Sequence, residues 1–414
     1  MILTGQLLLP HPSLGSTIAP GQVRIQRGRI AQVALGEGHP IGTPDIGSVQ
    51  TLISPGFIDT HLHLPQFDCI GIDGLTLLDW LERAVFPTEA KWADADHAGS
   101  VTTRVGKRLL AAGTTGIAAY ATVHHEGAKQ AIDALHSWGG RAIVGQVLMD
   151  QQAPAELIRP AKQLLAEAAA LQSQGVGRVE VAVTPRFAVS CSQELLTGCG
   201  DLAGRTQAAV QTHLSETIPE CELVKRLHGC ETYTEVYRRA GLLGARTILG
   251  HGIWLSESEC AAIARAGSVV AHCPTANLFL QAGSMDRGGH LDASMKIGLG
   301  SDVAGGPDVC MVRVARAMIE TAKSRRLNDG RTRVPTPGEA WGQITRRNAE
   351  VLGWSDSGSL TVGAWADLVV IDPTRGPAQP EWLRAVDPLS LLLYAFDERW
   401  ISHTVVQGRV AYAG

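Results

Sequence analysis

Short apolar runs alternate with longer helical patterns through most of the middle of this sequence. Eight of these runs are expected to be strands: Gly56–His61, Thr115–Tyr120, Arg141–Val147, Arg178–Pro185, Ala208–His213, Thr247–His251, Ser268–His272 and Lys296–Asp302. Several are nearly continuous in Val, Ile and Ala, which is typical of parallel strands that helices cover. Helices are expected between them, for example over Ala155–Ser173, Glu257–Ala266 and Asp308–Arg325. Eight strand–helix repeats over roughly 300 residues predict an α/β fold, a (β/α)8 barrel of the TIM type.

The two ends of the chain have the pattern of short strands. Residues Gln22–Val33 alternate apolar and polar side chains around a glycine-containing turn, as a hairpin does. The same pattern returns in Ala366–Asp372 and Ile401–Val410. Because neither end is large enough to build a core alone, we expect both to pair into one small β-sandwich. The expected division is 1–54 for the first part of the sandwich, 55–360 for the barrel and 361–414 for the second part.

Composition and charge limit the partners of such a chain. The net charge is −4 over 414 residues and no dense run of Lys or Arg occurs, so nothing indicates binding to nucleic acid. No apolar stretch is long enough to span a bilayer, and Met1–Pro10 has the pattern of a strand rather than of a signal peptide. The eight cysteines include no C-x-x-C pair, which argues against a disulfide scaffold or a cysteine-based zinc cluster. We therefore expect a cytoplasmic protein.

Histidines and an aspartate stand at the ends of four expected strands. His61 and His63 close the first strand, where residues two apart point to the same side, so both imidazoles could reach one ion. His213 ends the fifth strand, His251 the sixth and Asp302 the eighth. Each alone could be a core or surface residue, but the carboxyl ends of barrel strands meet at one rim, where barrel enzymes build their sites. Three neutral imidazoles and a carboxylate suit Zn²⁺ and leave room for a water.

Other histidines have less defined roles. His272 ends the seventh strand; we expect a satisfied core histidine there, and a residue that contacts the metal ligands from behind is the alternative. His124 and His125 follow the second strand and could line the pocket. Four more are expected to be structural or exposed, in loops or terminal strands: His11, His39, His290 and His403.

Four residues near the same rim could serve as an acid, a base or a substrate contact. Glu216 lies three residues past His213, where a carboxylate can shuttle protons, although a helix N-cap or a surface salt bridge is the alternative. Arg186 ends the fourth strand and could recognise a carbonyl oxygen, and Phe187 could wall an aromatic ring. Gln66 offers one acceptor and two donors, which suits the edge of a purine. Each could also be an ordinary loop residue.

The stretch from Leu64 to Lys91 is too long for an ordinary connection between a strand and a helix. It carries Trp80 and Phe86, with Trp92 directly after it, and it follows the first strand, on the catalytic face of a barrel. We expect it to form a lid or a pocket wall, and a packed surface excursion is the alternative.

Short motifs occur in order along nearly the whole chain. One set is Pro55–His63 (PGFIDTHLH), His251-Gly252, Ser301-Asp302 and Gly363–Asp372. A second set is His63–Gln66, Leu77–Leu81, Phe86–Glu89, Thr184–Ser190, Gln211–Glu216, Tyr233–Tyr237, His272–Asn277 and Gly300–Gly306. The first set resembles the amidohydrolase superfamily, and the second resembles the guanine deaminase family within it. Each motif is a modest signal, but their joint occurrence in order is specific.

The resemblance implies roles for individual residues. It implies one zinc ion per chain, held by His61, His63, His213 and Asp302. It implies that His251 and Asp302 act on the attacking water and that Glu216 is the proton shuttle. The expected substrate contacts are Gln66, Arg186, Phe187 and Trp80. A second ion is not expected, because the fourth strand has no lysine to bridge two ions. The family is usually dimeric, so a homodimer is expected.

The implied activity is hydrolytic deamination of guanine to xanthine and ammonia, in purine catabolism or salvage, with a small-molecule purine as partner. Thr275, Ala276 and Ser301 depart mildly from the family pattern and leave a related aminopurine or a pterin open as substrate. A hydrolase of the same superfamily acting on a triazine, an adenosine-like nucleoside or a hydantoin shares the metal set. A non-catalytic protein that keeps the barrel is a further alternative.

Overall fold

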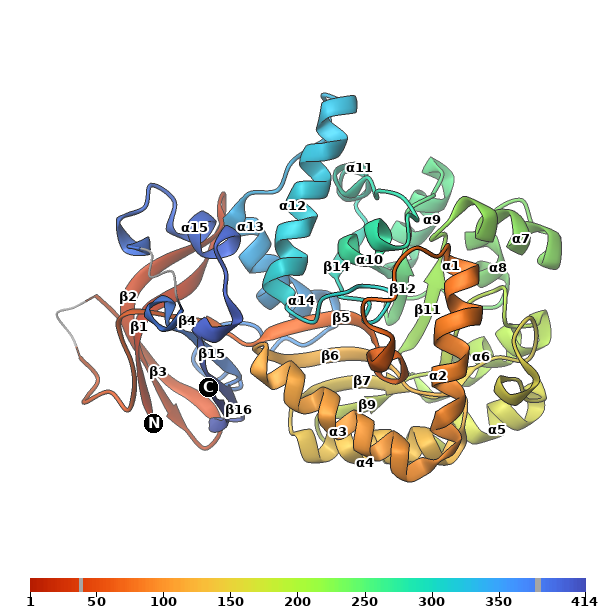
Figure 1. The fold of residues 1–414 in the computed structure, drawn as a ribbon, viewed down its shortest axis with the longest axis horizontal. Helices are drawn as coiled ribbons and strands as arrows, with labels where there is room; N and C mark the ends of the chain where they lie inside the picture. The colour runs from red at the N-terminus through yellow and green to blue at the C-terminus, as the bar shows by residue number, and fades with distance from the viewer. Residues whose placement is uncertain (37–39, 377–380) are drawn as a thin grey trace.

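The fold combines a barrel with a sheet assembled from both ends of the chain (Figure 1). The computed structural model describes residues 1–36, 40–376 and 381–414, so the prediction for His39 lies outside the described residues. The sheet lies on the left of Figure 1, where the red N-terminal and blue C-terminal segments meet, and the barrel with its helices lies on the right. The predicted fold class, a TIM-type barrel with a small sandwich domain built from both termini, is confirmed.

The barrel strands come from the middle of the chain and run parallel. They pair in two groups, β5–β6–β7–β9 and β11–β12–β13–β14, and a further short pair is formed by β8 and β10. Their bounds are β5 (Phe57–His63), β6 (Thr114–Tyr120), β7 (Arg141–Gly145), β8 (Val147–Leu148), β9 (Val179–Val181), β10 (Thr184–Pro185), β11 (Val210–Leu214), β12 (Thr247–His251), β13 (Val269–His272) and β14 (Lys296–Leu299). These ranges overlap all eight predicted strands, and β12 has the predicted bounds.

Backbone hydrogen bonds close the two groups of strands into a ring. At one seam, the Val183 amide donates to the Ala209 carbonyl at 2.9 Å, and the Gln211 amide donates to the Val183 carbonyl at 3.1 Å. At the other seam, the Asp302 amide donates to the His61 carbonyl at 2.8 Å. This second seam therefore fixes the segment after β14 beside the end of β5, where the candidate metal ligands lie.

Helices cover the outside of the barrel and join the strands (Figure 1). Those up to β12 are α1 (Leu77–Trp80), α2 (Phe86–Ala90), α3 (Ala95–Ala111), α4 (His125–Trp138), α5 (Ala161–Leu171), α6 (Gln193–Thr206), α7 (Ile218–His228) and α8 (Tyr233–Arg239). Those after it are α9 (Glu257–Ala266), α10 (Pro274–Phe279), α11 (Arg287–Asp292), α12 (Met311–Asn328), α13 (Pro337–Gly342), α14 (Asn348–Val351) and α15 (Pro388–Tyr394).

Local sequence signals explain where two of these helices begin. α9 has the predicted bounds: Ser256 and Glu259 form a capping box at its start, and Gly267 adopts a φ of 73° after it. The predicted helix Ala155–Ser173 is wrong in its first part, since Ala155–Leu157 is only a short 3-10 turn. Pro160 directly precedes α5, and the residue before a proline is disfavoured in helical conformation, so the helix begins only at Ala161.

The sheet that contains both ends of the chain is mixed. Its strand order is β17–β16–β15–β4–β1–β2–β3 among the described residues. The bounds are β1 (Ile2–His11), β2 (Gly15–Gln26), β3 (Arg29–Leu35), β4 (Ile46–Pro55), β15 (Leu368–Ile371), β16 (Ile401–Val406) and β17 (Arg409–Ala413). β4 pairs in parallel with β1 and antiparallel with β15, so it joins the strands from the two ends. Leu3, Leu7, Leu368 and Val370 are fully buried in one apolar cluster against this sheet.

The long segment after β5 is largely helical. It contains a 3-10 helix, η1 (Leu64–Cys69), then α1, a π-helical turn, η2 (Leu81–Val85), and α2. Figure 1 shows α1 and α2 in one upright stretch across the front of the barrel. No helix in the described part of the chain has both the length and the apolar character that crossing a membrane requires.

Candidate metal centre and active site

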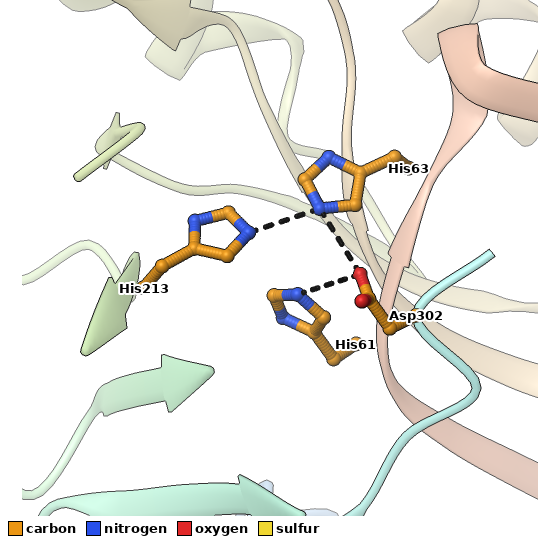
Figure 2. A group of neighbouring side chains, drawn as sticks. All are labelled: His61, His63, His213 and Asp302. Atoms are coloured by element: carbon orange, nitrogen blue, oxygen red, sulfur yellow. Dashed lines mark hydrogen bonds and ion pairs between the residues drawn. The ribbon is translucent and has the colours of Figure 1, made fainter. Parts of the chain in front are cut away.

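Three histidines and an aspartate meet at the carboxyl ends of the barrel strands (Figure 2). His61 and His63 come from β5, His213 from β11 and Asp302 from the segment after β14, and each offers one ligand atom within 4.8 Å of the others. The Nε2 atoms of His63 and His213 are 3.0 Å apart. Asp302 Oδ1 lies 3.3 Å from His61 Nε2 and 3.4 Å from His63 Nε2. All four side chains are buried, so the structure brings the predicted ligand set together.

The protonation and pairing of these side chains fit a bound cation. Burial lowers the pKa of His63 to about 4 and the pKa of His213 well below its usual value, so both imidazoles are neutral, which is the form that binds metal. Neither ring nitrogen of the fully buried His61 has a hydrogen-bond partner among the described residues. Buried polar atoms without a partner are costly, and a metal ion would satisfy the Nε2 atoms that face one another here.

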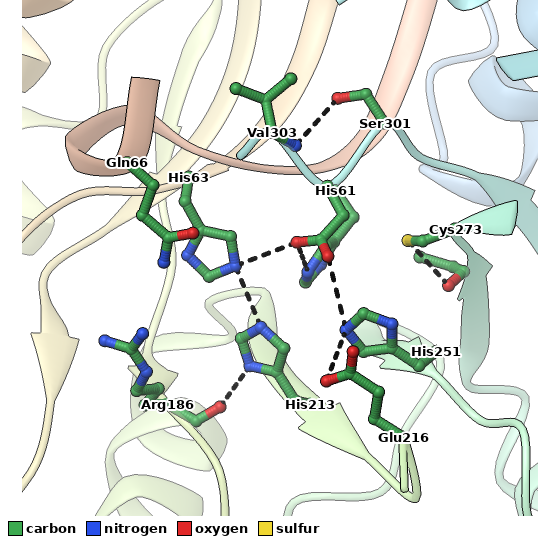
Figure 3. Close-up of polar contacts among 12 residues, drawn as sticks. His61, His63, Gln66, Arg186, His213, Glu216, His251, Cys273, Ser301 and Val303 are labelled. Carbon is green, nitrogen blue, oxygen red and sulfur yellow. Dashed lines mark hydrogen bonds and ion pairs between the residues drawn. The ribbon is translucent and has the colours of Figure 1, made fainter. Parts of the chain in front are cut away.

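Backbone and amide oxygens hold the far sides of two histidine rings. The Nδ1 atom of His213 is 2.6 Å from the carbonyl oxygen of Arg186, a contact drawn in Figure 3. Nδ1 of His251 is 3.0 Å from Oδ1 of Asn277. A carbonyl oxygen can only accept, so the Nδ1 atom of His213 carries the hydrogen. Its Nε2 lone pair is then directed at the cluster, as a metal ligand requires.

Glu216 and His251 form the other half of the site. Glu216 Oε2 lies 3.4 Å from His251 Nε2, which is in turn 3.9 Å from Asp302 Oδ2. Burial, together with the charges of Asp302 and Glu220, raises the pKa of Glu216 well above its usual range. This carboxyl group therefore keeps its proton at pH values where an ordinary glutamate is ionised, as a general acid needs.

The helix N-cap role, predicted as an alternative for Glu216, is filled by the next residue, Thr217. Thr217 caps α7, its hydroxyl accepting from the Glu220 amide, and the Glu220 carboxylate in turn accepts from the Thr217 amide. The same Glu220 carboxylate accepts from the Glu216 amide at 2.9 Å. The capping box therefore fixes the backbone of Glu216 and leaves its side chain free to face the metal cluster.

Three residues at the strand ends adopt left-handed backbone conformations. The φ values are 48° for Ser215, 69° for His251 and 51° for Asp302. Residues other than glycine rarely take such values, at a cost of about 1–3 kcal/mol each, and they persist where the surrounding structure fixes them. Backbone hydrogen bonds at or next to these residues supply that constraint: the Asp302 amide donates to His61, the Gly252 amide donates to Leu214 at 2.8 Å, and the Glu216 amide donates to Glu220.

A small cavity of about 30 Å³ lies against the cluster. Its walls are formed by His63, Gln66, Leu77, Trp80, Leu81, Arg186, Phe187, His213, Glu216, His251, Leu280 and Asp302. All four predicted substrate contacts are among them. Leu77, Trp80 and Leu81 belong to the segment Leu64–Lys91, which therefore forms a wall of the cavity rather than a separate surface excursion. A larger hollow of about 1020 Å³ lies beside α9, α11 and α12 and includes none of the cluster.

Three histidines differ from what the sequence indicates. His124 and His125 are absent from the cavity wall; their rings lie against Arg159 at 3.3 Å and Gln146 at 3.2 Å, so the prediction that they line the pocket is wrong. His272 is a buried core residue, but neither of its ring nitrogens has a hydrogen-bond partner among the described residues, so it is not satisfied as predicted. Burial lowers the pKa of His272 to about 3, which keeps the ring uncharged.

Two buried acids at the site, Asp59 and Glu89, are not predicted from the sequence as site residues. Asp59 accepts from the amides of His61 at 3.1 Å and Ser301 at 2.9 Å, and it ties β5 to the segment that carries Asp302. Glu89 accepts from the side chains of both Gln66 and Arg186. Asp59 and Glu89 both lie within motifs of the family resemblance, which marks the segments without indicating what these carboxylates contact.

Comparison with known proteins assigns the family. Residues 52–411, nearly the whole chain, match the Amidohydrolase family. This chain belongs to the amidohydrolase family. Amidohydrolases are typically metal-dependent, in agreement with the His61, His63, His213 and Asp302 cluster.

This amidohydrolase is similar to guanine deaminases over most of its length. It is 37% identical to guanine deaminase of Dictyostelium discoideum over 326 residues, which cover 77% of this chain and 72% of that protein. It is 32% identical to guanine deaminase of Escherichia coli over 408 residues, covering 95% and 92% of the two chains. The crystal structure of guanine deaminase from C. acetobutylicum with bound guanine in the active site superposes with a TM-score of 0.91, at 30% identity and 99% coverage of both chains. The predicted family resemblance is therefore confirmed.

Proposed function

We propose that this amidohydrolase hydrolyses the exocyclic C–N bond of guanine to give xanthine and ammonia, with one zinc ion per chain. The observation that carries the proposal is that one buried cavity is lined by three of the four candidate ligands, by Glu216 and by the polar pair Gln66 and Arg186. The similarity to guanine deaminases of diverse organisms supports guanine as the substrate.

Zinc suits the donor set because it accepts three imidazole nitrogens and a carboxylate and keeps a position for water. His61, His63, His213 and Asp302 would hold the ion, and when bound it supplies Lewis acidity that makes water a nucleophile at neutral pH. The remaining chemistry falls to side chains of this protein.

Proton movement would be divided between three of these side chains. His251 would orient the attacking water through Nε2, and Asp302 would accept a proton from that water. As the water oxygen bonds to C2 of guanine, Glu216 would donate its proton to the neighbouring N3, so negative charge does not accumulate there. The proton held by Asp302 would then pass to the amino group as the C2–N bond breaks, so that the group leaves as ammonia. The hydroxyl group on C2 would return its proton to Glu216 as the carbonyl of xanthine forms. In the overall balance, the two protons of the water end on N3 and on ammonia.

Entry of the substrate requires the cavity wall to move. A volume of about 30 Å³ has room for only a few waters, so the cavity cannot hold a purine as it stands. Leu77, Trp80 and Leu81 form the apolar part of the wall that lies on the segment between β5 and α3. In this proposal the segment moves outward to admit guanine and then closes, which would keep water out during the reaction.

We propose further that the protein acts as a cytoplasmic homodimer in purine breakdown or salvage. All eight cysteines are free and buried, which supports a reducing compartment. Exposed Trp254 and Leu278 line the large hollow beside α9 and α12, and exposed apolar surface of this kind supports an interface with a second copy. Light scattering that gave the mass of a single chain at micromolar concentration would contradict the dimer.

The activity is tested by ammonia release from a substrate panel. Zinc-loaded protein is incubated with guanine, 8-oxoguanine, adenine, cytosine, ammeline and pterins, and products are separated by chromatography. We expect a strong preference for guanine with xanthine as product. Activity confined to another ring would overturn the substrate but keep the hydrolytic chemistry. Absence of activity on all of them, with zinc bound, would contradict the proposed function.

A further inference from the structure

Glu89 lies behind the two polar side chains that face the substrate cavity. It is on α2, it is 4% exposed, and it is absent from the cavity wall. Its Oε1 accepts from Gln66 Nε2 at 3.0 Å, and its Oε2 accepts from Arg186 Nη1 at 2.6 Å. Both side chains are likewise buried, and Figure 3 shows them on the same side of the metal cluster. One carboxylate therefore holds both.

The carboxylate of Glu89 determines which atom of Gln66 faces the cavity. A carboxylate oxygen can only accept, so the amide nitrogen of Gln66 must point at Glu89. The amide oxygen of Gln66 is then left for the substrate. Without that carboxylate the amide could rotate by half a turn and present its nitrogen instead, because glutamine is both donor and acceptor.

Arg186 completes the pattern. One of its terminal nitrogens, Nη1, is engaged with Glu89, and its guanidinium lies over the ring of Phe86 at 5.5 Å. The guanidinium carries only donors, and those not used by Glu89 remain for the cavity, which Arg186 lines. On this side of the cavity, Gln66 thus presents an acceptor and Arg186 presents donors.

We propose that Glu89 is a positioning residue that selects the base. By fixing one acceptor beside donors, it favours a purine whose carbonyl oxygen at C6 adjoins a protonated N1. It disfavours a purine with an amino group at C6 beside a bare N1, because donors would meet donors and acceptors would meet acceptors. This inference rests on the proposed function, since it assumes that the cavity binds purines.

The expected size of the discrimination follows from the number of mismatched groups. Each buried polar group left without a partner weakens binding by roughly tenfold to a hundredfold. Two such groups are mismatched with the wrong edge, so the native protein should prefer the carbonyl edge by roughly 100- to 10,000-fold. In Glu89→Gln, Gln66 can rotate and Arg186 loses its charged partner, so this preference should fall at least about tenfold.

Binding of two inert purines tests the inference independently of catalysis. Hypoxanthine has the carbonyl edge and adenine the amino edge, and neither carries an amino group at C2. Calorimetry with zinc-loaded protein should give a large preference for hypoxanthine in the native chain and a reduced one in Glu89→Gln. A loss of packing alone would weaken both purines equally and leave their ratio unchanged, which would overturn the inference.

Glu82→Gln is the matched control for this substitution. Glu82 lies on η2, in the same segment as Glu89, and its side chain is exposed. The change removes one carboxylate charge from the segment without touching Gln66 or Arg186. Its ratio of hypoxanthine to adenine binding should equal that of the native chain. A ratio that fell as far in Glu82→Gln as in Glu89→Gln would also overturn the inference, because charge alone would then explain it.

A second variant and a kinetic measurement keep the test decisive. If Glu89→Gln does not fold, as circular dichroism and zinc content would show, Glu89→Asp shortens the same carboxylate by one carbon and should also lower the preference for hypoxanthine. The ratio of kcat/KM for guanine over 2,6-diaminopurine, which both carry an amino group at C2, should fall in parallel. If the native protein turns over guanine but the ratio of hypoxanthine to adenine binding is unchanged in the Glu89 variant, only the role of Glu89 is refuted. If that ratio falls in the variant but the native protein does not turn over guanine, only the proposed activity is refuted.

Discussion

Replacement of Glu216 by glutamine separates proton transfer from substrate binding. The two side chains have nearly the same shape, but an amide cannot release a proton to the ring nitrogen. Glu216 Oε1 is buried without a hydrogen-bond partner among the described residues, and Oε2 lies 3.4 Å from His251 Nε2. Because the raised pKa keeps the native carboxyl group protonated, the substitution replaces one neutral group by another and should leave folding intact.

The expected loss is in kcat. General acid–base catalysis by a positioned side chain contributes about 10²- to 10⁴-fold. At 1.36 kcal/mol for each factor of ten, this corresponds to roughly 2.7–5.4 kcal/mol of transition-state stabilisation. The KM for guanine should change less than about fivefold, because Gln66 and Arg186 remain in place.

The assay is steady-state formation of xanthine by zinc-loaded protein, with zinc content measured on the same samples. Glu222→Gln is the matched control, since Glu222 lies on α7 with its side chain 54% exposed and pairs with Lys225 at the surface. Its kcat should equal that of the native chain. An equal loss of kcat and of guanine binding in Glu216→Gln, or a loss of kcat below about tenfold, would refute the assignment of Glu216 as the proton shuttle.

Three further changes probe the buried ion pair, the metal and the scaffold. Arg186→Met leaves the Glu89 carboxylate buried without its charged partner, so the free energy of unfolding in urea should fall by about 3–5 kcal/mol and the KM for guanine should rise. A fall in unfolding free energy below about 1 kcal/mol would contradict the role of this pair. Removal of zinc by a chelator should lower the melting temperature, since zinc at a thousand times its Kd stabilises the fold by about 4 kcal/mol. Calorimetry should show that the melting temperature recovers when zinc is added back, and an unchanged melting temperature would speak against a metal held by the histidines and Asp302. Ser256→Ala removes the cap of α9 and should cost about 1 kcal/mol in urea unfolding while kcat stays unchanged; a fall in kcat would mean that α9 influences the site.

The barrel and its candidate ligands can be predicted from the sequence because both depend on local patterns. A buried apolar run can be recognised within a few residues, and β12 accordingly has its predicted bounds. The ligands then follow, since the strand ends of a barrel share one rim. The predicted helix Ala155–Ser173 begins too early because Pro160 delays the start of α5, and this error affects that one helix alone.

Contacts between distant side chains cannot be predicted in this way. Glu89 meets Gln66 and Arg186 only because α2 is folded back towards the end of the fourth barrel strand, and no periodicity describes that path. The polar partners of the His124 and His272 rings cannot be predicted from the sequence either. Whether a buried ring meets a polar partner depends on neighbours that come from elsewhere in the chain.

The sheet shared by both ends of the chain has a consequence for the order of events during synthesis. β15, the strand that pairs with one edge of β4, is made roughly 300 residues after β4. At 5–20 residues per second, that edge waits for roughly 15–60 s with its amide and carbonyl groups unpaired. An open strand edge can pair with another nascent chain, so a chaperone or early docking on the barrel would have to shield it. The synthesis of β15 therefore ends the period in which this edge of β4 is open to such pairing.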